Sequence, residues 1–322
     1  MQDYISIIEK AIKENPISGS PAQLYDPVNY IMQLGGKRVR PVLALIGYEM
    51  FAGKIDEKAI NLALAIEVFH NFTLMHDDIM DNAPVRRGKQ TVHLKWNSST
   101  ALLAGDNMLI KAYGLLAKND TSVLKPLLEI FNRTASEVCE GQQLDMDFEL
   151  LSSVSEDEYI EMITLKTAVL LGCSLSMGAI AAGANEEQIK HLFEYGKDMG
   201  IAFQLMDDYL DAYGDHQKVG KQKGGDIISN KKTYLYIKAL EKADGEVKER
   251  LNFLFGNSTM NSDDKIKEVL SIFSFLEIEK EIKDKIRSYE VKASDHLQFS
   301  GFENVNLEFL IQLSQSLKGR EF

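Results

Sequence analysis

The sequence lacks the features of two large classes of protein. Its 322 residues include only two cysteines, Cys139 and Cys173, which form neither a CxxC pair nor a metal-ligand spacing. Two cysteines are too few for a disulfide framework in a chain of this length, so a cytoplasmic location is expected. Positive charge is also scarce, because the formal net charge is −12. Such a chain has no broad positive field to attract a phosphate backbone, so nucleic acid is not expected as a partner.

Long apolar runs are almost absent. Residues 1–15 carry five charges and no unbroken apolar stretch, which predicts an amphipathic surface helix rather than a signal peptide. Residues 167–185 carry no charge and approach the ~20 residues that span a bilayer. Glycine, serine and alanine keep the hydrophobicity of this stretch low, and such small residues suit close packing inside a soluble protein. We therefore expect a buried helix there and no membrane span.

Alternating apolar and polar runs are also missing, as is a repeat of fixed period. Apolar residues recur instead at three- and four-residue intervals, as in Ile60, Leu64 and Val68. Only six prolines interrupt the chain, and glycine marks most of the other turns. The pattern predicts an all-α fold, with residues 1–322 forming a single domain of antiparallel helices around a central cavity.

Two acidic motifs of the form DDxxD stand out, at residues 77–81 and 207–211. On a helix, residues four apart share one face, so the first and last aspartate of each motif form a pair. Apolar residues precede both motifs, and carboxylates against an apolar wall repel one another unless a cation compensates them. Mg²⁺ takes one or two carboxylates and completes its shell with phosphate oxygens. The predicted metal ligands are Asp77, Asp78, Asp81, Asp207, Asp208 and Asp211.

Short basic clusters accompany the acidic motifs. Residues 35–41 join a Gly-Gly turn to a helix that begins near a proline, a setting in which backbone N–H groups and basic side chains bind phosphate. Arg86 and Arg87 follow the first motif, and Lys221 and Lys231 follow the second. A single cluster of this kind usually serves solubility. The position of all of them beside acidic pairs favours a site for a diphosphate with metal ions.

These motifs, in this order, resemble those of the polyprenyl synthetase family of trans-isoprenyl diphosphate synthases. The resemblance runs from about residue 30 to residue 234 and includes Lys166-Thr167 and Phe203-Gln204. It implies the isoprenoid synthase type I fold, a homodimer, and a prenyltransferase that joins isopentenyl diphosphate to an allylic diphosphate. The allylic substrate would be dimethylallyl, geranyl or farnesyl diphosphate, and the product a short all-trans prenyl diphosphate.

The resemblance also implies roles for individual residues. Asp77, Asp81 and Asp207 would coordinate three Mg²⁺ ions, with the other three aspartates as further ligands. Side chains that would hold the allylic diphosphate are Arg86, Lys166, Lys221 and Lys231, the last in competition with Lys223 and Lys232. Side chains that would hold isopentenyl diphosphate are Lys37, Arg40, His70 and Arg87. Lys166, Thr167 and Gln204 would act beside the reacting carbons.

Of the histidines, His70 is singled out because it lies seven residues, two helical turns, before Asp77 on the same face. A lone histidine on a helix is more often a packed residue, and His76 and His93 are interpreted in that way. The chemistry follows from charge. Cleavage of the allylic C1–O bond leaves a diphosphate that metal ions, Arg and Lys stabilise, and the isopentenyl double bond then attacks C1. Apolar walls must exclude water from the cation.

Residues before the first motif set the expected product length. Phe72 is the fifth residue upstream of Asp77, Thr73 the fourth and Phe69 the eighth. At a rise of about 1.5 Å per residue, the two rings lie roughly 7 and 12 Å below the acidic pair. One aromatic at the fifth position, without one at the fourth, resembles the geranylgeranyl-type enzymes of the family more than the farnesyl-type, so the resemblance implies geranylgeranyl diphosphate, with farnesyl diphosphate second. The alternative is that both rings only pack in the core.

Three rival functions remain open at this point. A class I terpene cyclase shares an aspartate-rich helix but needs no second substrate site. A non-catalytic subunit of a heteromeric synthase would be expected to have lost one acidic motif, and both are intact. A structural or cation-buffering helical protein would bind metal without diphosphate.

Overall fold

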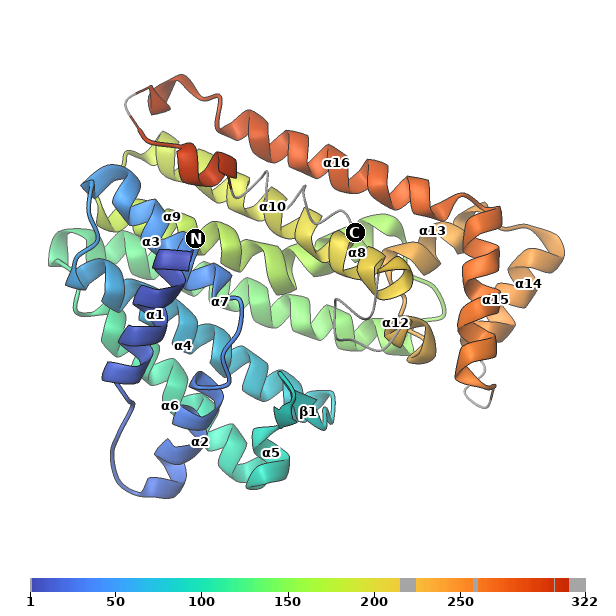
Figure 1. Cartoon of the computed structure of the whole chain (residues 1–322), viewed down its shortest axis with the longest axis horizontal. Helices are drawn as coiled ribbons and strands as arrows, with labels where there is room; N and C mark the ends of the chain where they lie inside the picture. Colours follow the sequence, from blue (N-terminus) through green and yellow to red (C-terminus); the bar gives the residue numbers. More distant parts are fainter. Residues whose placement is uncertain (1, 215–223, 257–259, 304, 313–322) are drawn as a thin grey trace. The chain divides into compact units, whose positions relative to one another are not determined.

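The computed structural model describes residues 2–214, 224–256, 260–303 and 305–312 (Figure 1). Within these residues the chain is helical apart from one short hairpin, which confirms the predicted all-α fold. The first half contains α1 (Gln2–Glu14), α2 (Ala22–Met32), α3 (Val39–Ala52), α4 (Glu57–Met80), β1 (Val85–Arg86), β2 (Lys89–Gln90), α5 (Val92–Lys95), α6 (Ser98–Leu116) and α7 (Thr121–Leu150). The second half contains α8 (Glu156–Ile163), the π-helical turn η1 (Thr164–Ala168), α9 (Val169–Ala181), α10 (Glu186–Tyr213), α12 (Gly225–Ile228), α13 (Tyr234–Lys242), α14 (Gly245–Gly256), α15 (Ser262–Phe275), α16 (Ile278–His296) and η2 (Ser300–Phe302).

The chain divides into two compact units. The first comprises Met1–Thr134, Leu170–Phe193 and Phe299–Leu310, and the second Ala135–Val169, Glu194–Gln298 and Ile311–Phe322. The first acidic motif belongs to the first unit and the second motif to the second. Each unit is described by itself, and the single domain expected from the sequence stays a prediction.

Helix α4 is the centre of the first unit and lies between α3 and α6 (Figure 1). Asp56 starts the helix, since its side chain accepts hydrogen bonds from the N–H groups of Lys58 and Ala59 at 2.9 and 3.1 Å. Buried residues then occur on nearly every face, from Ala59 to Phe69. A helix that is apolar all round belongs in a core. The core therefore fixes α4 along its length, and with it the acidic motif at its end.

Helices α3 and α9 cross at two glycines in the same unit. A Cβ on Gly47 would lie 2.1 Å from the carbonyl oxygen of Leu175, and a Cβ on Gly178 would lie 2.2 Å from that of Ala44. Only glycine permits backbones to approach this closely. The stretch Glu156–Ala181 is long and apolar enough to cross a membrane, but 78% of its most apolar window is buried inside the structure. This burial is what a packed helix requires, and the absence of a membrane span stays a prediction.

The second unit packs around the end of α10. Its core joins Tyr159 of α8, Leu205 of α10, Tyr234 of α13 and Ile282 of α16. Helix α8 begins with a capping box, in which Ser155 and Glu158 each bond the other's backbone N–H group. These contacts position α8 and η1 against the acidic end of α10.

Candidate active site

The first acidic motif forms the carboxyl end of α4. Asp77 lies in the last turn, and Asp81 ends the helix with its N–H group 2.8 Å from the carbonyl oxygen of Asp77. The carboxyl end of a helix carries partial negative charge, so carboxylates are unfavourable there and cations are favourable. Asp77 is half-buried and Asp81 is exposed. The arrangement favours a divalent cation at this pair.

Asp78, between them, is turned inward and is 1% exposed. One of its carboxylate oxygens accepts two hydrogen bonds from Arg86, from Nε at 3.0 Å and from a terminal nitrogen at 2.6 Å. Hydrogen bonds between two charged groups are stronger than those between neutral groups. Arg86 thus fixes the hairpin β1–β2 to the end of α4, and Asp78 already holds a cationic partner.

The turn of this hairpin docks onto the Gly-Gly turn before α3. Arg87 and Gly88 both have positive φ, 52° and 73°, as the central residues of a type I′ hairpin turn require. The Arg87 guanidinium donates to the carbonyl oxygen of Gly35. Its carbon would lie only 2.9 Å from a Cβ at Gly36, where φ is 135°. Gly35 and Gly36 therefore allow the Arg87 side chain to contact the backbone just before Lys37.

Arg40 and His70 meet beneath this contact, with 3.2 Å between a guanidinium nitrogen and Nε2 of the ring. A guanidinium only donates, so Nε2 accepts and the ring is neutral. Burial, followed by the charges of Arg40 and Arg87, holds the pKa of His70 well below its usual range. Desolvation lowers the pKa of Arg40 to about 10. In the described chain, Nε of Arg40 is buried without a hydrogen-bond partner. We name these three side chains, Arg40, His70 and Arg87, the basic cluster.

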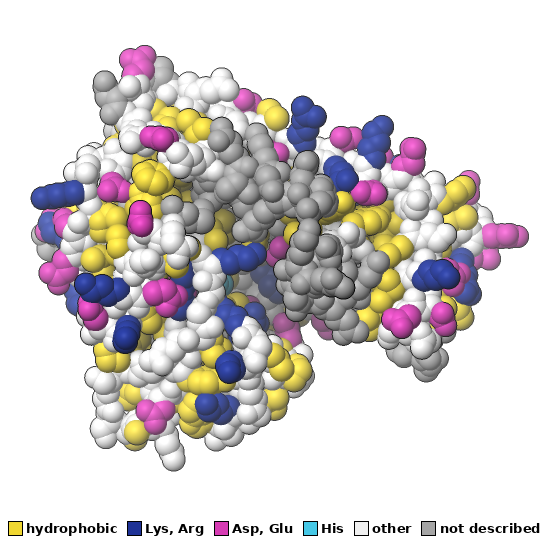
Figure 2. All heavy atoms as spheres, in the orientation of Figure 1, with side chains coloured by type: hydrophobic (Ala, Val, Ile, Leu, Met, Phe, Trp, Pro, Cys, Tyr) yellow, Lys and Arg dark blue, Asp and Glu magenta, His cyan; other side chains and the backbone are white. Residues whose placement is uncertain are grey.

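Arg38 shows what a structural arginine looks like in the same segment. It is 4% exposed and pairs with buried Glu67 and with Glu9, and it donates to the carbonyl oxygen of Met32. Its charge is satisfied inside the protein. Lys37 is exposed. Figure 2 shows several Lys and Arg side chains together on one face of the first unit, near α2.

The second acidic motif lies in the last two turns of α10. Asp207 and Asp211 are half-buried. Chain that follows the motif returns to it: the Asp226 N–H group donates to an Asp211 carboxylate oxygen at 3.0 Å, and the Gly224 N–H group to its carbonyl oxygen at 2.9 Å. Lys221, predicted to hold the allylic diphosphate, and Lys223, the competitor of Lys231, lie outside the described residues.

Asp208, the middle residue of this motif, is 4% exposed. The Tyr159 hydroxyl donates to it at 2.5 Å, and Gln204 and the Tyr234 N–H group are further donors. Burial raises the pKa of Asp208 to about 8, with a contribution from the charge of Asp226, and the three donors oppose the rise. The carboxyl group is therefore kept neutral by its surroundings rather than by a cation.

Lys166 and Thr167 lie in the π-helical turn η1, beside the second motif. The Lys166 ammonium is 2.5 Å from a carboxylate oxygen of Asp145 on α7. The Thr167 hydroxyl donates to the side-chain oxygen of Gln204 on α10 over 3.4 Å. The structure thus brings together Thr167 and Gln204, which the sequence analysis placed beside the reacting carbons.

Two neighbouring lysines after the second motif have different surroundings. The Lys232 ammonium lies 2.8 Å from the carbonyl oxygen of Phe148, at the carboxyl end of α7. Lys231 is exposed. The Lys232 ammonium is therefore held by the protein, and the choice of Lys231 as the residue that reaches a diphosphate stays a prediction.

The aromatic residues below the first motif form a connected row. The Phe69 and Phe72 rings are 5.7 Å apart, and Phe72 lies 4.7 Å from the His76 ring. Phe69 is 1% exposed and packs against Phe131 of α7 at 5.0 Å. Thr73 donates to the carbonyl oxygen of His70 at 2.8 Å. Phe69 is a core residue, whereas Phe72 is only half-buried and can present its ring to a ligand.

Two residues of this region were missed by sequence reasoning. Asp145 and Tyr159 carry no motif, because their importance comes from partners 21 and 49 residues away in the chain. Near Asp145 the sequence offers one local signal, because Gly141, four residues earlier, is a glycine in the interior of a helix and can mark a close backbone contact.

The described residues contain no group of three or more His, Cys, Asp and Glu side chains that could hold a metal ion by itself. Mg²⁺ needs only one or two carboxylates when phosphate supplies the other oxygens. The pairs Asp77 with Asp81 and Asp207 with Asp211 fit that requirement.

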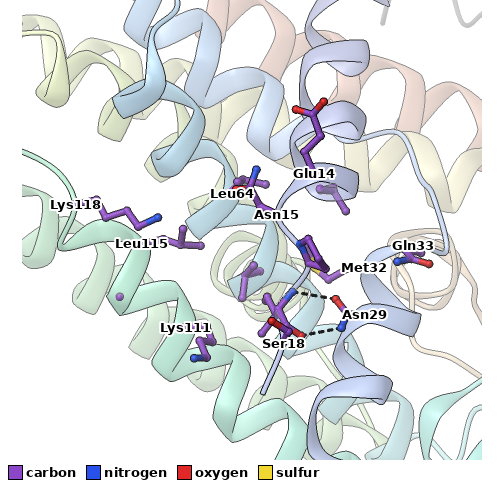
Figure 3. Close-up of a pocket in the computed structure, with 15 residues that line it drawn as sticks. Glu14, Asn15, Ser18, Asn29, Met32, Gln33, Leu64, Lys111, Leu115 and Lys118 are labelled. Atoms are coloured by element: carbon purple, nitrogen blue, oxygen red, sulfur yellow. Dashed lines mark hydrogen bonds between the residues drawn. The ribbon is translucent and has the colours of Figure 1, made fainter. Parts of the chain in front are cut away.

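A cavity of about 560 Å³ lies elsewhere in the first unit, among α1, α2, α4 and α6 (Figure 3). Asn29 closes one side through two hydrogen bonds to the backbone of Ile17, at 3.0 and 2.7 Å. None of the predicted site residues that the structure describes lines this cavity. It is separate from the acidic motif and the basic cluster.

The family pattern named Polyprenyl synthetase matches residues 21–273 of the chain. The chain belongs to the polyprenyl synthetase family. It is therefore a prenyltransferase, as the motifs predicted. The match includes both acidic motifs, the basic cluster and η1.

Relatives of this polyprenyl synthetase support the same conclusion. It is 38% identical to a short chain isoprenyl diphosphate synthase of Methanothermobacter thermautotrophicus, over 85% of the chain and 83% of the relative. It is 36% identical to a geranylgeranyl pyrophosphate synthase of Geoglobus acetivorans, over 100% and 98%. A crystal structure of a geranylgeranyl pyrophosphate synthase superposes with a TM-score of 0.92 at 46% identity, over 100% of the chain and 99% of that structure. The isoprenoid synthase fold expected from the resemblance is confirmed.

Proposed function

We propose that the chain condenses isopentenyl diphosphate with an allylic diphosphate and releases a short all-trans prenyl diphosphate, with geranylgeranyl diphosphate as the main product and farnesyl diphosphate second. The observation that carries the proposal is the basic cluster. Arg40 and Arg87 bring two positive charges together beside neutral His70, and the buried Nε of Arg40 has no hydrogen-bond partner in the described chain. A buried charge of this kind is favourable only when an anion completes it. A diphosphate group supplies such an anion.

The basic cluster, with exposed Lys37, holds isopentenyl diphosphate in this proposal. Neutral His70 presents its Nδ1 hydrogen as a donor, because Nε2 accepts from Arg40. Arg86 and Lys166 hold the allylic diphosphate together with Lys231 and Lys221, and both Arg86 and Lys166 already lie on carboxylates, Asp78 and Asp145. The two diphosphates are thus bound by different sets of cations.

Magnesium fits the acidic motifs, with Asp77, Asp81 and Asp207 as its first ligands and Asp78, Asp208 and Asp211 as further partners. When bound, three such ions supply positive charge that stabilises the departing diphosphate. The chain's own residues contribute through fixed charge and dipoles. Arg86 and Lys166 offset the charge of the leaving group, and the oxygens of Thr167 and Gln204, 3.4 Å apart, stabilise positive charge on the allylic carbon.

The bond changes balance without any other reactant. The allylic C1–O bond breaks and its electron pair leaves with the diphosphate. The isopentenyl double bond then forms the new bond to C1, and the proton lost from the adjacent carbon passes to the released diphosphate. Apolar side chains such as Phe72 exclude water, which would otherwise convert the cation to an alcohol.

A homodimer in the cytoplasm is part of the proposal. Helix α6 exposes Leu102, Leu103, Ile110 and Tyr113, the second and third of these by 59 and 67%. Apolar side chains grouped on one helix mark a surface that another protein covers. A second copy of the chain on α6 agrees with the family resemblance.

The test is product analysis by mass spectrometry after incubation with isopentenyl diphosphate, Mg²⁺ and each allylic primer in turn. A C20 diphosphate from farnesyl diphosphate is the expected result. Hydrocarbon from farnesyl diphosphate alone would indicate a terpene cyclase. If the purified chain gives no product with any primer, although calorimetry detects Mg²⁺ and pyrophosphate binding, it is a non-catalytic subunit. Metal binding without pyrophosphate binding would identify a cation-buffering protein.

A further inference from the structure

The turn that carries Lys166 and Thr167 departs from α-helical geometry. Helix α8 ends at Ile163, residues Thr164–Ala168 form one π-helical turn, and α9 continues from Val169. The Val169 N–H group bonds the carbonyl oxygen of Thr164, five residues back. A π-turn inserted into a helix has an extra residue per turn and often marks a functional site. Something must hold this less stable geometry in place.

Gly141 of α7 lies against the beginning of the turn. A Cβ at Gly141 would be 2.2 Å from the backbone nitrogen of Lys166 and 2.6 Å from its Cα. Ordinary contact of a Cβ begins at 3.4 Å. Any side chain at this position would therefore push the Lys166 backbone away by about 1.2 Å, the difference from 2.2 Å.

Gly200 of α10 lies against the end of the turn. A Cβ there would be 2.6 Å from Cα of Ala168 and 2.8 Å from its Cβ. The shift needed is about 0.8 Å, the difference between 2.6 and 3.4 Å. In the sequence, Thr167 stands between the two residues that these glycines touch. Both glycines are buried and lie in the interior of long helices, where glycine costs about 1 kcal/mol relative to alanine.

We propose that Gly141 and Gly200 are positioning residues of the active site, which hold the π-turn so that Lys166 and Thr167 meet their partners. The inference rests on the proposed function. The same close approach lets the Lys166 ammonium reach Asp145 on α7, four residues after Gly141, and lets the Thr167 hydroxyl reach Gln204 on α10, four residues after Gly200. Each glycine thus lies one helical turn from the residue that receives the side chain it positions. The π-turn, with Lys166 and Thr167, is thus held between the backbones of α7 at Gly141 and α10 at Gly200.

The contrast with other glycines separates positioning from packing. Gly47 of α3 is just as tight, 2.1 Å from the Leu175 carbonyl oxygen, but it lies in the first unit and touches no predicted site residue. Gly114 of α6 has nothing within 4 Å of a Cβ. Gly47→Ala therefore creates a comparable steric clash away from the π-turn. Gly114→Ala makes the same substitution with no steric clash.

The experiment measures kcat and KM for Gly141→Ala, Gly200→Ala and both controls. Rates are expressed per folded molecule, and the folded fraction is measured by circular dichroism and gel filtration. A misplacement of about 1 Å lowers rates by about 100-fold. We expect kcat to fall by about 100-fold in Gly141→Ala and by about 10-fold in Gly200→Ala, while KM for isopentenyl diphosphate stays within threefold. Gly47→Ala lowers Tm but keeps kcat per folded molecule, and Gly114→Ala keeps kcat and does not lower Tm, since a helix favours alanine over glycine.

A double-mutant cycle supplies the decisive readout. If Gly141 acts through Lys166, then Gly141→Ala adds less than threefold to the loss already caused by Lys166→Ala. Additive losses would overturn the inference, as would a kcat within threefold of wild type in a folded Gly141→Ala protein. If both glycine variants fail to fold while Gly47→Ala folds, the glycines serve the fold and the inference is wrong. Failure of the proposed function is distinct, because the wild-type chain would then form no prenyl diphosphate.

Discussion

The two acidic motifs have the same sequence pattern and the same place at the carboxyl end of a helix, but their middle residues are neutralised in opposite ways. Asp78 accepts a two-pronged ion pair from Arg86. Asp208 accepts from the uncharged hydroxyl of Tyr159, and burial raises its pKa to about 8. A repeated motif therefore does not imply a repeated environment. The first motif pairs its buried carboxylate with a guanidinium, and in the second motif burial raises the pKa of the middle carboxyl group.

The largest effect should be common to both motifs. Asp77→Ala and Asp207→Ala each remove one member of a carboxylate pair that would hold Mg²⁺, and turnover should fall on the order of 10³-fold. Helical content by circular dichroism should stay unchanged, since neither residue is fully buried. The comparison of the motifs predicts similar losses in the two variants. Full activity in either one would refute its role in metal binding.

The next effect should separate the motifs by stability. Asp78→Ala leaves the Arg86 guanidinium, with a side chain 28% exposed, beside a gap, and we expect the free energy of unfolding to fall by about 2 kcal/mol. Urea unfolding measures this loss. Asp120→Ala is the matched control, because it breaks the exposed pair with Lys58 and should cost at most about 1 kcal/mol. Equal losses in the two variants would mean that the Arg86 contact stabilises nothing beyond a surface pair.

The pH dependence of stability should separate them further. Folding raises the pKa of Asp208 from 3.8 to about 8, so between these values the folded chain binds more protons than the unfolded chain. Stability from this group is therefore present at low pH and is lost as pH rises through about 8. In EDTA, Tm should fall by several degrees between pH 5 and pH 9, and Asp208→Asn should flatten that slope. A slope that persists in Asp208→Asn belongs to another group.

The smallest effect concerns the residue five places before each motif. Phe72 stands there in α4, half-buried, and Ala202 stands there in α10, 4% exposed. At this fifth position, only the first motif has an aromatic ring. Phe72→Ala should lengthen the main product by one five-carbon unit with little change in the rate of the first condensation, as chromatography of the dephosphorylated products would show. An unchanged product would remove Phe72 from this role. Phe69→Ala instead opens the core against Phe131 and should cost about 3 kcal/mol of stability.

Sequence reasoning predicted the elements of the fold well because helices leave a local signal. The apolar spacing around Leu64 and Val68 and the DDxxD spacing are both properties of neighbouring residues, and the structure has α4 and α10 at those positions. The π-turn at Lys166 was not predicted. One extra residue in a turn shifts the spacing of apolar residues, and that shift cannot be detected in a stretch that is apolar on every side. The residues themselves were identified, but their surroundings were not.

The partners of the site residues could not be predicted for a second reason. Asp145 meets Lys166 and Tyr159 meets Asp208 only because helices distant in sequence pack together. The difference between the surroundings of Asp78 and those of Asp208 depends on these partners and on burial. Tertiary packing, rather than the motif, decides it.

The β1–β2 hairpin has a consequence for how the first unit is held together. Two consecutive guanidinium groups leave it in different directions, with Arg86 reaching the Asp78 carboxylate and Arg87 reaching the Gly35 carbonyl oxygen. Two adjacent residues therefore connect the acidic end of α4 to the backbone that precedes α3. A shift of either helix end would therefore move the other, so this two-stranded sheet keeps the acidic end of α4 and the basic segment before α3 in a fixed arrangement.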